Sequence, residues 1–306
     1  MNNPVKHHFV PECYLKGFAD SKGQLWRKSL EYDTVKSCAP AGICYEDHLY
    51  TILSGDRTVT GIGSGDAYYI EKNIFGKQEA AYPRHRDKVI SFSMVPRIVP
   101  SQTYISFLDF LITLKRRNPC HLNRQGKLLQ SVIDTDMQKS MLQPVLEKIC
   151  DAIGIDLEGD AYFKNYDHEN LKKPYFLKNT GLRRFTNKDQ RVLKDFRDFL
   201  LKYRQTILYA PLGKTFVTSD NPGFIINHNE LYSFGGFAEG FQFVFPVSSK
   251  ACLMIESQTP KENCDIDQTI YNRIICDRDV ESINSATRQT AINYIISESQ
   301  AGLKLL

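Results

Sequence analysis

The sequence lacks several features that would place the protein in a specialised class. No run of about 18 apolar residues occurs in the 306 residues, which argues against a transmembrane helix and predicts no membrane partner. The N-terminus lacks the basic and then apolar layout of a secretory signal. No internal repeat and no low-complexity tract is visible, so we expect neither a solenoid nor a biased array.

Paired cysteines are also missing. The eight cysteines are scattered, and no two of them form a Cys-x-x-Cys pair. This scatter argues against a disulfide framework and against a structural zinc site. We therefore expect reduced thiols in the cytoplasm of a microbe. The composition, with 42% hydrophobic and 24% charged residues, is that of an ordinary globular protein.

The net charge of +4 is ordinary, but its distribution along the chain is uneven. Residues 84–204 carry a net charge of +9, and the remainder of the chain carries −5. A basic face attracts nucleic acid through the release of counterions. The alternative is a set of solvated helix faces, which needs no partner.

The pattern of apolar residues predicts an α+β fold. Helical spacing follows Asp66 and recurs in Ser101–Lys115, Lys127–Gly154 and Asn187–Tyr203. Short β-type runs include Gly23–Ser29 and Leu49–Leu53, and several more follow Gln205, including a hairpin around Ser248-Ser249-Lys250. Asp279–Ser297 reads as a final helix.

We therefore expect a helical middle lobe packed on a mainly antiparallel sheet built from N- and C-terminal strands. The expected division is residues 1–65 with the first strands, 66–204 as a basic helical lobe, and 205–306 as C-terminal strands with a final helix. Residues 1–65 and 205–306 are expected to form one integrated domain.

The first polar motif is Lys6-His7-His8-Phe9-Val10-Pro11. Adjacent side chains of an extended segment point to opposite faces, so His7 and His8 should differ in environment. One of them is expected to face inward with its imidazole hydrogen-bonded. The other is then available for acid–base chemistry near neutral pH, although a purely structural pair explains the motif equally well.

The helical region supplies a second set of candidates. Glu71 and Glu79 are eight residues apart, which places them on roughly the same side of an α-helix, where they bind a divalent cation or remain solvated. The next helix ends in Arg116-Arg117-Asn118-Pro119-Cys120-His121. Arg116 and His121 have the Arg-x4-His spacing of helical ribonucleases of the HEPN type. However, Pro119 should break a helix that carries both, and the helix macrodipole alone accounts for arginines at a C-terminus.

Thr218-Ser219-Asp220-Asn221-Pro222 is the third polar motif. It gathers two hydroxyls, a carboxylate and an amide directly after an apolar strand. Such rigid placement suits an active site, and it also suits a simple Asx-type turn stiffened by proline.

Taken together, these motifs resemble the bacterial family catalogued as domain of unknown function 4238. The resemblance rests on the His-His-x-Val-Pro motif with Tyr14, on Leu49-Tyr50-Thr51, Glu71 and Arg117-x-Pro119, on Thr218–Pro222 and on Phe245-Pro246-Val247-Ser248. The chain departs from that family at Glu12-Cys13, where a glutamine and an aromatic residue are more usual. The resemblance implies no mechanism, but it implies a setting in variable bacterial genome islands and thus in defence against phage.

Two functions follow as hypotheses. The first is a nuclease that hydrolyses RNA or DNA, as the toxic effector of an anti-phage system. His7 or His8 would move protons, and Asp220, with Glu71, would orient a histidine or bind Mg²⁺ or Mn²⁺. Arg116 and Arg117, with Ser219 and Asn221, would hold the substrate, and the basic lobe would dock nucleic acid. The second is a non-catalytic sensor or interaction protein that binds a partner protein or forms oligomers. In that protein the His-His motif is a structural clasp, a set of side-chain contacts that joins the N-terminal strand region to the C-terminal sheet.

Overall fold

The computed structural model describes residues 5–52, 66–123, 191–235, 237–260 and 268–304, and also residues 127, 144, 148, 178, 182 and 185. Among them, no helix has both the length and the apolar character needed to cross a membrane. The chain forms two compact units. Unit 1 comprises Met1–His7, Glu46–Gln78 and Arg116–Phe196, and unit 2 comprises His8–Tyr45, Glu79–Lys115 and Arg197–Leu306. The predicted division at residues 65 and 204 stays a prediction.

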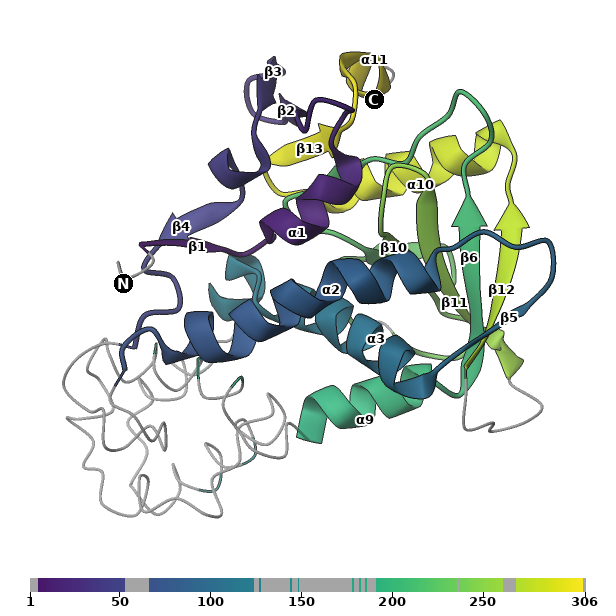
Figure 1. The fold of residues 1–306 in the computed structure, drawn as a ribbon, viewed down its shortest axis with the longest axis horizontal. Helices are drawn as coiled ribbons and strands as arrows, with labels where there is room; N and C mark the ends of the chain where they lie inside the picture. Colours follow the sequence, from purple (N-terminus) through teal and green to yellow (C-terminus); the bar gives the residue numbers. More distant parts are fainter. Residues whose placement is uncertain are drawn as a thin grey trace. The chain divides into compact units, whose positions relative to one another are not determined.

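Helices and strands both contribute heavily, which confirms the α+β class (Figure 1). The strands are β1 (Lys6–His8), β2 (Leu25–Ser29), β3 (Val35–Cys38), β4 (Tyr45–Asp47), β5 (Arg97–Val99), β6 (Tyr203–Tyr209), β7 (Thr218–Ser219), β8 (Phe224–Asn227), β9 (Glu230–Tyr232), β10 (Gln242–Pro246), β11 (Ala251–Pro260), β12 (Gln268–Ile274) and β13 (Tyr294–Ser297). The helices are α1 (Glu12–Leu15), η1 (Lys16–Phe18), η2 (Pro40–Gly42), the π-helix η3 (Ile70–Phe75), α2 (Gly76–Val89), α3 (Ser101–Arg116), α9 (Arg191–Leu200), α10 (Asp277–Thr290) and α11 (Gln300–Lys304).

The main sheet of unit 2 has the strand order β5-β12-β6-β11-β10-β8-β9. Its pairs are antiparallel except for β12 and β6, so the prediction of a mainly antiparallel sheet is confirmed. The hairpin predicted around Ser248-Ser249-Lys250 is present as β10 and β11. β5 lies within the region predicted to be helical. Pro96 and Pro100 bracket β5, and a residue before proline favours an extended backbone, which explains this exception.

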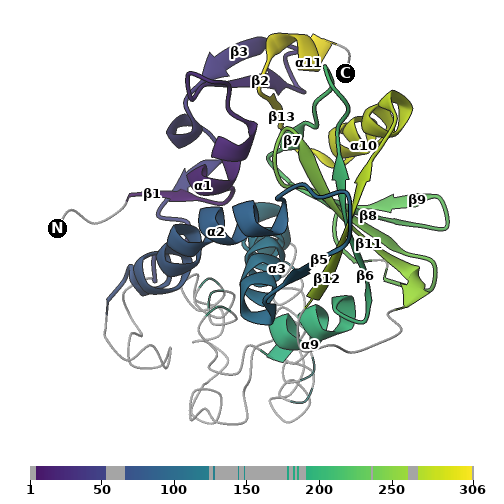
Figure 2. The ribbon, with the colours of Figure 1, turned by 45° about the vertical axis from the view of Figure 1, so that its right-hand side comes forward.

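Helices cover both faces of the main sheet (Figure 2). On one face, Tyr104 of α3 donates a hydrogen bond from its hydroxyl to the buried amide oxygen of Gln205 in β6. On the other face, Val280 of α10 packs in a cluster with Leu208, Phe224, Val244, Cys252 and Met254. The alternation of side chains along each strand therefore produces two apolar surfaces, each with its own helix.

A smaller antiparallel sheet of unit 2 has the order β3-β2-β13-β7 and combines N-terminal with C-terminal strands, as predicted. It also corrects the prediction of one helix over Asp279–Ser297. α10 ends at Thr290, and the following residues form β13 between β2 and β7. The pairing partners are distant in sequence, so the local apolar spacing alone did not reveal this strand.

One predicted strand is wrong, and one predicted helix lies almost wholly outside the residues that the structure describes. Leu49–Leu53 was predicted as a strand, but the nearest strand is β4, which pairs with β1. The N–H of Tyr50 donates to the side chain of His7 and that of Ile52 to the carbonyl of Ala67, so they do not join a strand ladder. The helix predicted over Asn187–Tyr203 is present as α9, whereas the predicted Lys127–Gly154 helix lies almost wholly outside the described residues.

Candidate functional site

The carboxylate of Asp220 binds the backbone of a distant loop. Asp220 directly follows β7, is 1% exposed, and accepts hydrogen bonds from the N–H of Ile292 at 2.9 Å and of Asn293 at 2.7 Å. Its own N–H donates to the carbonyl of Tyr294 at 3.2 Å. Burial raises the pKa of Asp220, and these backbone hydrogen bonds oppose that rise because they favour the carboxylate. Asp220 thus ties the end of β7 to the segment between α10 and β13.

Asn221 makes a comparable set of contacts within unit 2. Its N–H donates to the hydroxyl of Ser219, and its side-chain amide donates to the carbonyl of Thr290 at 2.8 Å. Its amide oxygen accepts from the buried ammonium of Lys115 at 2.7 Å, and Lys115 also donates to the carbonyl of Gly223 at 3.0 Å. The turn therefore binds α10 and α3 together.

The residue after this turn has to be glycine. Gly223 has φ +73°, a conformation that costs a residue with a Cβ more than it costs glycine. A Cβ atom at Gly223 would lie 2.3 Å from a ring carbon of Phe245, which is fully buried. The predicted polar turn lies between β7 and β8, and the glycine after it packs directly against Phe245 of β10.

Sequence reasoning missed Lys115 as a member of this cluster. The signal was present, because Lys115 stands four residues after Leu111 and seven after Leu108, on the apolar side of α3. A cation on that side requires a polar partner inside the protein. Only the fold reveals that Asn221 supplies this partner.

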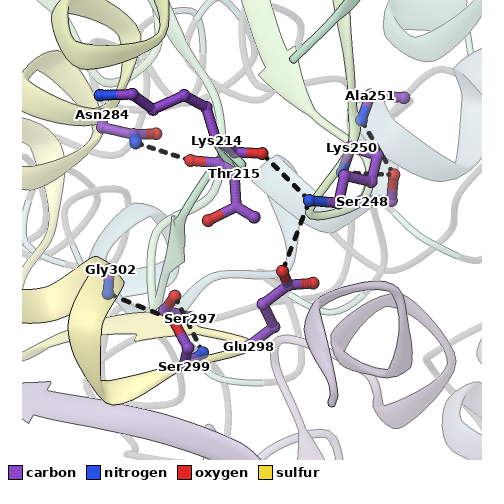
Figure 3. A network of polar contacts seen from close by, with 10 residues as sticks. All are labelled: Lys214, Thr215, Ser248, Lys250, Ala251, Asn284, Ser297, Glu298, Ser299 and Gly302. Carbon is purple, nitrogen blue, oxygen red and sulfur yellow. Dashed lines mark hydrogen bonds and ion pairs between the residues drawn. The ribbon is translucent and has the colours of Figure 1, made fainter. Parts of the chain in front are cut away.

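We expect Lys115→Met to lower the free energy of unfolding by about 1–2 kcal/mol, because Asn221 and Gly223 each lose a buried hydrogen bond. Lys250→Met is the matched control (Figure 3). Lys250 also bridges two groups, the carbonyl of Lys214 at 3.0 Å and Glu298 at 3.6 Å, but its side chain is 56% exposed. The control should change stability by less than about 0.5 kcal/mol. Chemical denaturation compares the two variants. Equal losses of unfolding free energy would contradict the stabilising role of the buried Lys115 hydrogen bonds.

Tyr14, three residues after the first motif, joins α1 to the sheets of unit 2. Its hydroxyl donates to the carbonyl of Pro246 at 2.6 Å and lies 2.9 Å from the hydroxyl of Thr218. Its ring packs edge-on against Phe245. Burial raises the pKa of Tyr14, so the phenol stays protonated and can serve as a donor. Tyr14 is thus a structural clasp between α1 and the strands β7 and β10.

His7 belongs to unit 1 and is fully buried. Its Nδ1 accepts the backbone N–H of Tyr50 at 2.9 Å, and its ring stacks on the Tyr50 ring with centroids 5.8 Å apart. Because a backbone N–H only donates, Nδ1 must carry a lone pair and the proton of the neutral ring must be on Nε2. If Nδ1 were protonated, its N–H would point at the N–H of Tyr50, and neither group could accept the other's hydrogen bond.

This hydrogen bond bears directly on the predicted acid–base role of His7. A base that accepts a proton at Nε2 needs its own proton on Nδ1, and the Tyr50 N–H occupies that position. The neutral Nε2–H ring is in turn too weak an acid to donate a proton. While the hydrogen bond persists, Nδ1 of His7 holds the Tyr50 segment, and the acid–base role of His7 stays a prediction.

His8 has the different environment that the alternation predicts. It belongs to unit 2 and is partly exposed, with Nε2 3.3 Å from the carbonyl oxygen of Ala41 and its ring edge-on to Tyr45. The expectation of one inward and one accessible histidine is therefore met, with His7 as the inward residue.

The two arginines lie in unit 1 on an aromatic cluster. The guanidinium carbon of Arg117 is 4.8 Å from the ring centre of Phe75, and that of Arg116 is 5.9 Å from the ring centre of Phe185. Tyr50 connects this cluster to His7, because its hydroxyl donates to the carbonyl of Arg117 at 2.7 Å. Both arginines are buried, and burial lowers the pKa of Arg116 to about 10.

Helix geometry changes two of the predicted pairings in this region. Glu71 lies in the π-helix η3 and Glu79 in α2, so an argument that assumes one continuous α-helix does not apply to this pair. α3 ends at Arg116, and residues 119–123 form a separate helical segment after Asn118, whose side chain accepts the N–H of Cys120. Pro119 therefore breaks the helix as expected, and Arg116 and His121 do not share one helix.

The structure thus places the predicted residues in two groups. His7, Glu71, Arg116 and Arg117 belong to unit 1, and His8, Ser219, Asp220 and Asn221 belong to unit 2. Within the described ranges, no group of three or more His, Cys, Asp or Glu side chains is arranged to hold a metal ion. The hydroxyl of Tyr14 contacts Thr218 and Pro246, and the hydroxyl of Tyr50 donates to the carbonyl of Arg117. These hydrogen bonds of the two tyrosines were not predicted.

Comparison with known proteins gives one match. A family model with the description "Protein of unknown function (DUF4238)" matches residues 6–301, which is nearly the whole chain. No curated protein and no solved structure matches.

Proposed function

Because this chain belongs to the DUF4238 family, whose description assigns no reaction, we propose a function from the contacts of its motifs. The protein is a non-catalytic interaction protein. The motifs around His7 and Asp220 are structural clasps that hold its binding surfaces in place.

The observation that carries this proposal is the hydrogen bond from Tyr50 N–H to His7 Nδ1. It gives the buried histidine of the first motif a structural task that occupies its Nδ1 lone pair, which supports a non-catalytic role. Asp220 supports the same conclusion, since both of its carboxylate oxygens accept backbone N–H groups. These two hydrogen bonds fix the carboxylate to the loop between α10 and β13, which is a structural task.

The test is incubation of the full-length protein with labelled RNA, single-stranded DNA and duplex DNA, with and without Mg²⁺ or Mn²⁺. We expect all three polymers to remain intact. Cleavage by the wild-type protein that His8→Ala or Arg116→Lys abolishes, with the melting temperature unchanged, would overturn the proposal. Cleavage that both variants retain and that separates from the protein on further purification would identify a contaminating enzyme and leave the proposal standing. Cleavage that stays with the protein would overturn it.

A nuclease is the second candidate, and the Arg116–Arg117 pair favours it. Burying two guanidinium groups is costly, and strongly shifted charged groups are enriched at functional sites. Glu71 lies in a π-helix of the same unit, and π-helical turns are often found at functional sites. In this candidate the arginines hold a phosphate and Glu71 moves the proton, as a toxic effector in phage defence.

Arg116→Lys separates the two candidates, because lysine keeps the charge but loses the planar fork that binds phosphate through two hydrogen bonds. A nuclease centred on Arg116 should lose most of its cleavage in this variant. For the non-catalytic protein, Arg116→Lys changes stability alone.

A further inference from the structure

The main sheet of unit 2 carries a row of accessible side chains beyond the part of its face that α10 covers. Register places Arg204 of β6 opposite Glu256 of β11, and Glu256 opposite Gln242 of β10. In the other direction, Ile270 pairs with Gln205, so Thr269 of β12 lies beside Arg204. All four side chains of this row, Thr269, Arg204, Glu256 and Gln242, are partly exposed.

This row lies on the α10 side of the sheet. Side chains alternate along a strand, so Arg204 and Leu208 point to the same face of β6. Leu208 packs in the cluster that contains Val280 of α10. α10 thus covers the Leu208 end of this face, and the Arg204 end carries polar and aromatic groups.

A cation stacked on an aromatic ring forms the centre of the row. The guanidinium carbon of Arg204 lies 3.9 Å from the ring centre of Tyr271, which neighbours Thr206 on the same face. In the part of the chain that the structure describes, the Arg204 Nε has no hydrogen-bond partner. A guanidinium over a tyrosine ring is held there by the cation–π attraction, and the Arg204 side chain as a whole is partly exposed although its Nε is buried.

The surrounding charges favour an anionic partner. Lys202 and Arg273 are exposed, and they stand two residues from Arg204 and Tyr271 respectively. Glu256 is the one acid in the row of four. The amide of Gln242 donates to a carboxylate oxygen of Glu256 at 3.2 Å. Among the described residues of this part of the sheet, three cations thus accompany one carboxylate that is already hydrogen-bonded.

We propose that this face, which we call the Arg204 face (Lys202, Arg204, Gln242, Glu256, Tyr271 and Arg273), binds single-stranded nucleic acid. A base stacks on the Arg204–Tyr271 pair, the flanking cations contact phosphates, and Gln242 and Glu256 face the base edges. A nucleic-acid base can stack on the Arg204–Tyr271 pair, whereas an acidic peptide would use only the positive charges. This difference favours nucleic acid as the partner. The inference rests on the proposed function and specifies the partner of the non-catalytic protein.

The test measures fluorescence anisotropy of a labelled oligo(dT) and oligo(U) of about 15 nucleotides with the full-length protein. Tyr271→Leu and Arg204→Gln should each raise Kd about tenfold, because stacking contributes a large part of the affinity for each base. Arg273→Gln should weaken binding and lower the salt dependence by about one phosphate contact. Lys36→Gln is the matched control, since it removes an exposed cation from β3 of the other sheet and should leave Kd within about twofold.

Three outcomes would overturn the inference: no binding at about 50 mM salt, equal losses in Lys36→Gln and Arg273→Gln, or binding of a poly-Glu peptide in preference to the oligonucleotides. Because Arg273 is exposed, its variant tests the face even when Tyr271→Leu fails to fold. A gel of the oligonucleotide after each measurement keeps the two proposals apart. Suppose that the gel shows cleaved product and that the variants lose binding as predicted. This result would overturn the non-catalytic function, but the proposal that the Arg204 face binds nucleic acid would stand.

Discussion

Asp220→Ala should lower the free energy of unfolding by about 2–3 kcal/mol. The substitution deprives the N–H groups of Ile292 and Asn293 of their acceptor, and hydrogen bonds to a charged group contribute about 1.5–3 kcal/mol. Ile292 is 43% exposed, so water replaces part of the loss. Glu281→Ala is the control, because it also removes a carboxylate from unit 2 but breaks only a solvent-exposed ion pair with Lys214. Denaturant unfolding should show less than about 0.5 kcal/mol for the control.

The same carboxylate predicts a pH dependence. Burial raises the pKa of Asp220 above its ordinary value of 3.8, so the folded protein holds this proton more tightly than the unfolded chain does. The contribution of Asp220 to stability is therefore greatest below about pH 4 and falls as the pH rises through the folded pKa. When denaturant unfolding is followed upward from about pH 4, Asp220→Asn, which does not titrate, should lack this decline. Identical pH profiles for the two proteins would contradict the shift.

The elements that the sequence predicted best are those whose partners are local. The β10–β11 hairpin joins two apolar runs across a short polar turn, and α3 has a strong apolar side between proline-rich and basic ends. β13 was missed because its apolar residues continue the spacing of α10. Its strand conformation depends on β2 and β7, which come from elsewhere in the chain.

The candidate site divides in the same way. The residue types of Thr218–Pro222 sufficed to predict a rigid polar turn. They did not reveal that the carboxylate of Asp220 accepts a hydrogen bond from the backbone N–H of Ile292, 72 residues further along the chain. They also did not reveal that Lys115 donates a hydrogen bond to Asn221. Local chemistry thus identified which residues matter, while the contacts that give them a structural role are long-range.

His7→Ala should have the largest effect, a loss of about 3 kcal/mol in the free energy of unfolding. It removes a fully buried ring stacked on Tyr50, opens a cavity, and leaves the Tyr50 N–H without its acceptor. His8→Ala is the matched control from the same motif. Because His8 is partly exposed, that substitution should cost less than about 1 kcal/mol.

His7→Asn distinguishes the structural role from a catalytic one. The asparagine carbonyl oxygen stands about where Nδ1 stood, so it restores the acceptor for Tyr50 N–H without restoring the ring. A structural clasp therefore predicts a stability between those of His7→Ala and the wild type, measured by denaturant unfolding. A proton-transferring histidine predicts instead a His7→Asn protein of wild-type stability that has lost a nuclease activity. The hydrogen bond from Tyr50 N–H to His7 Nδ1 predicts the intermediate stability. A His7→Asn protein with wild-type stability and no nuclease activity would refute the structural role that we assign to this hydrogen bond.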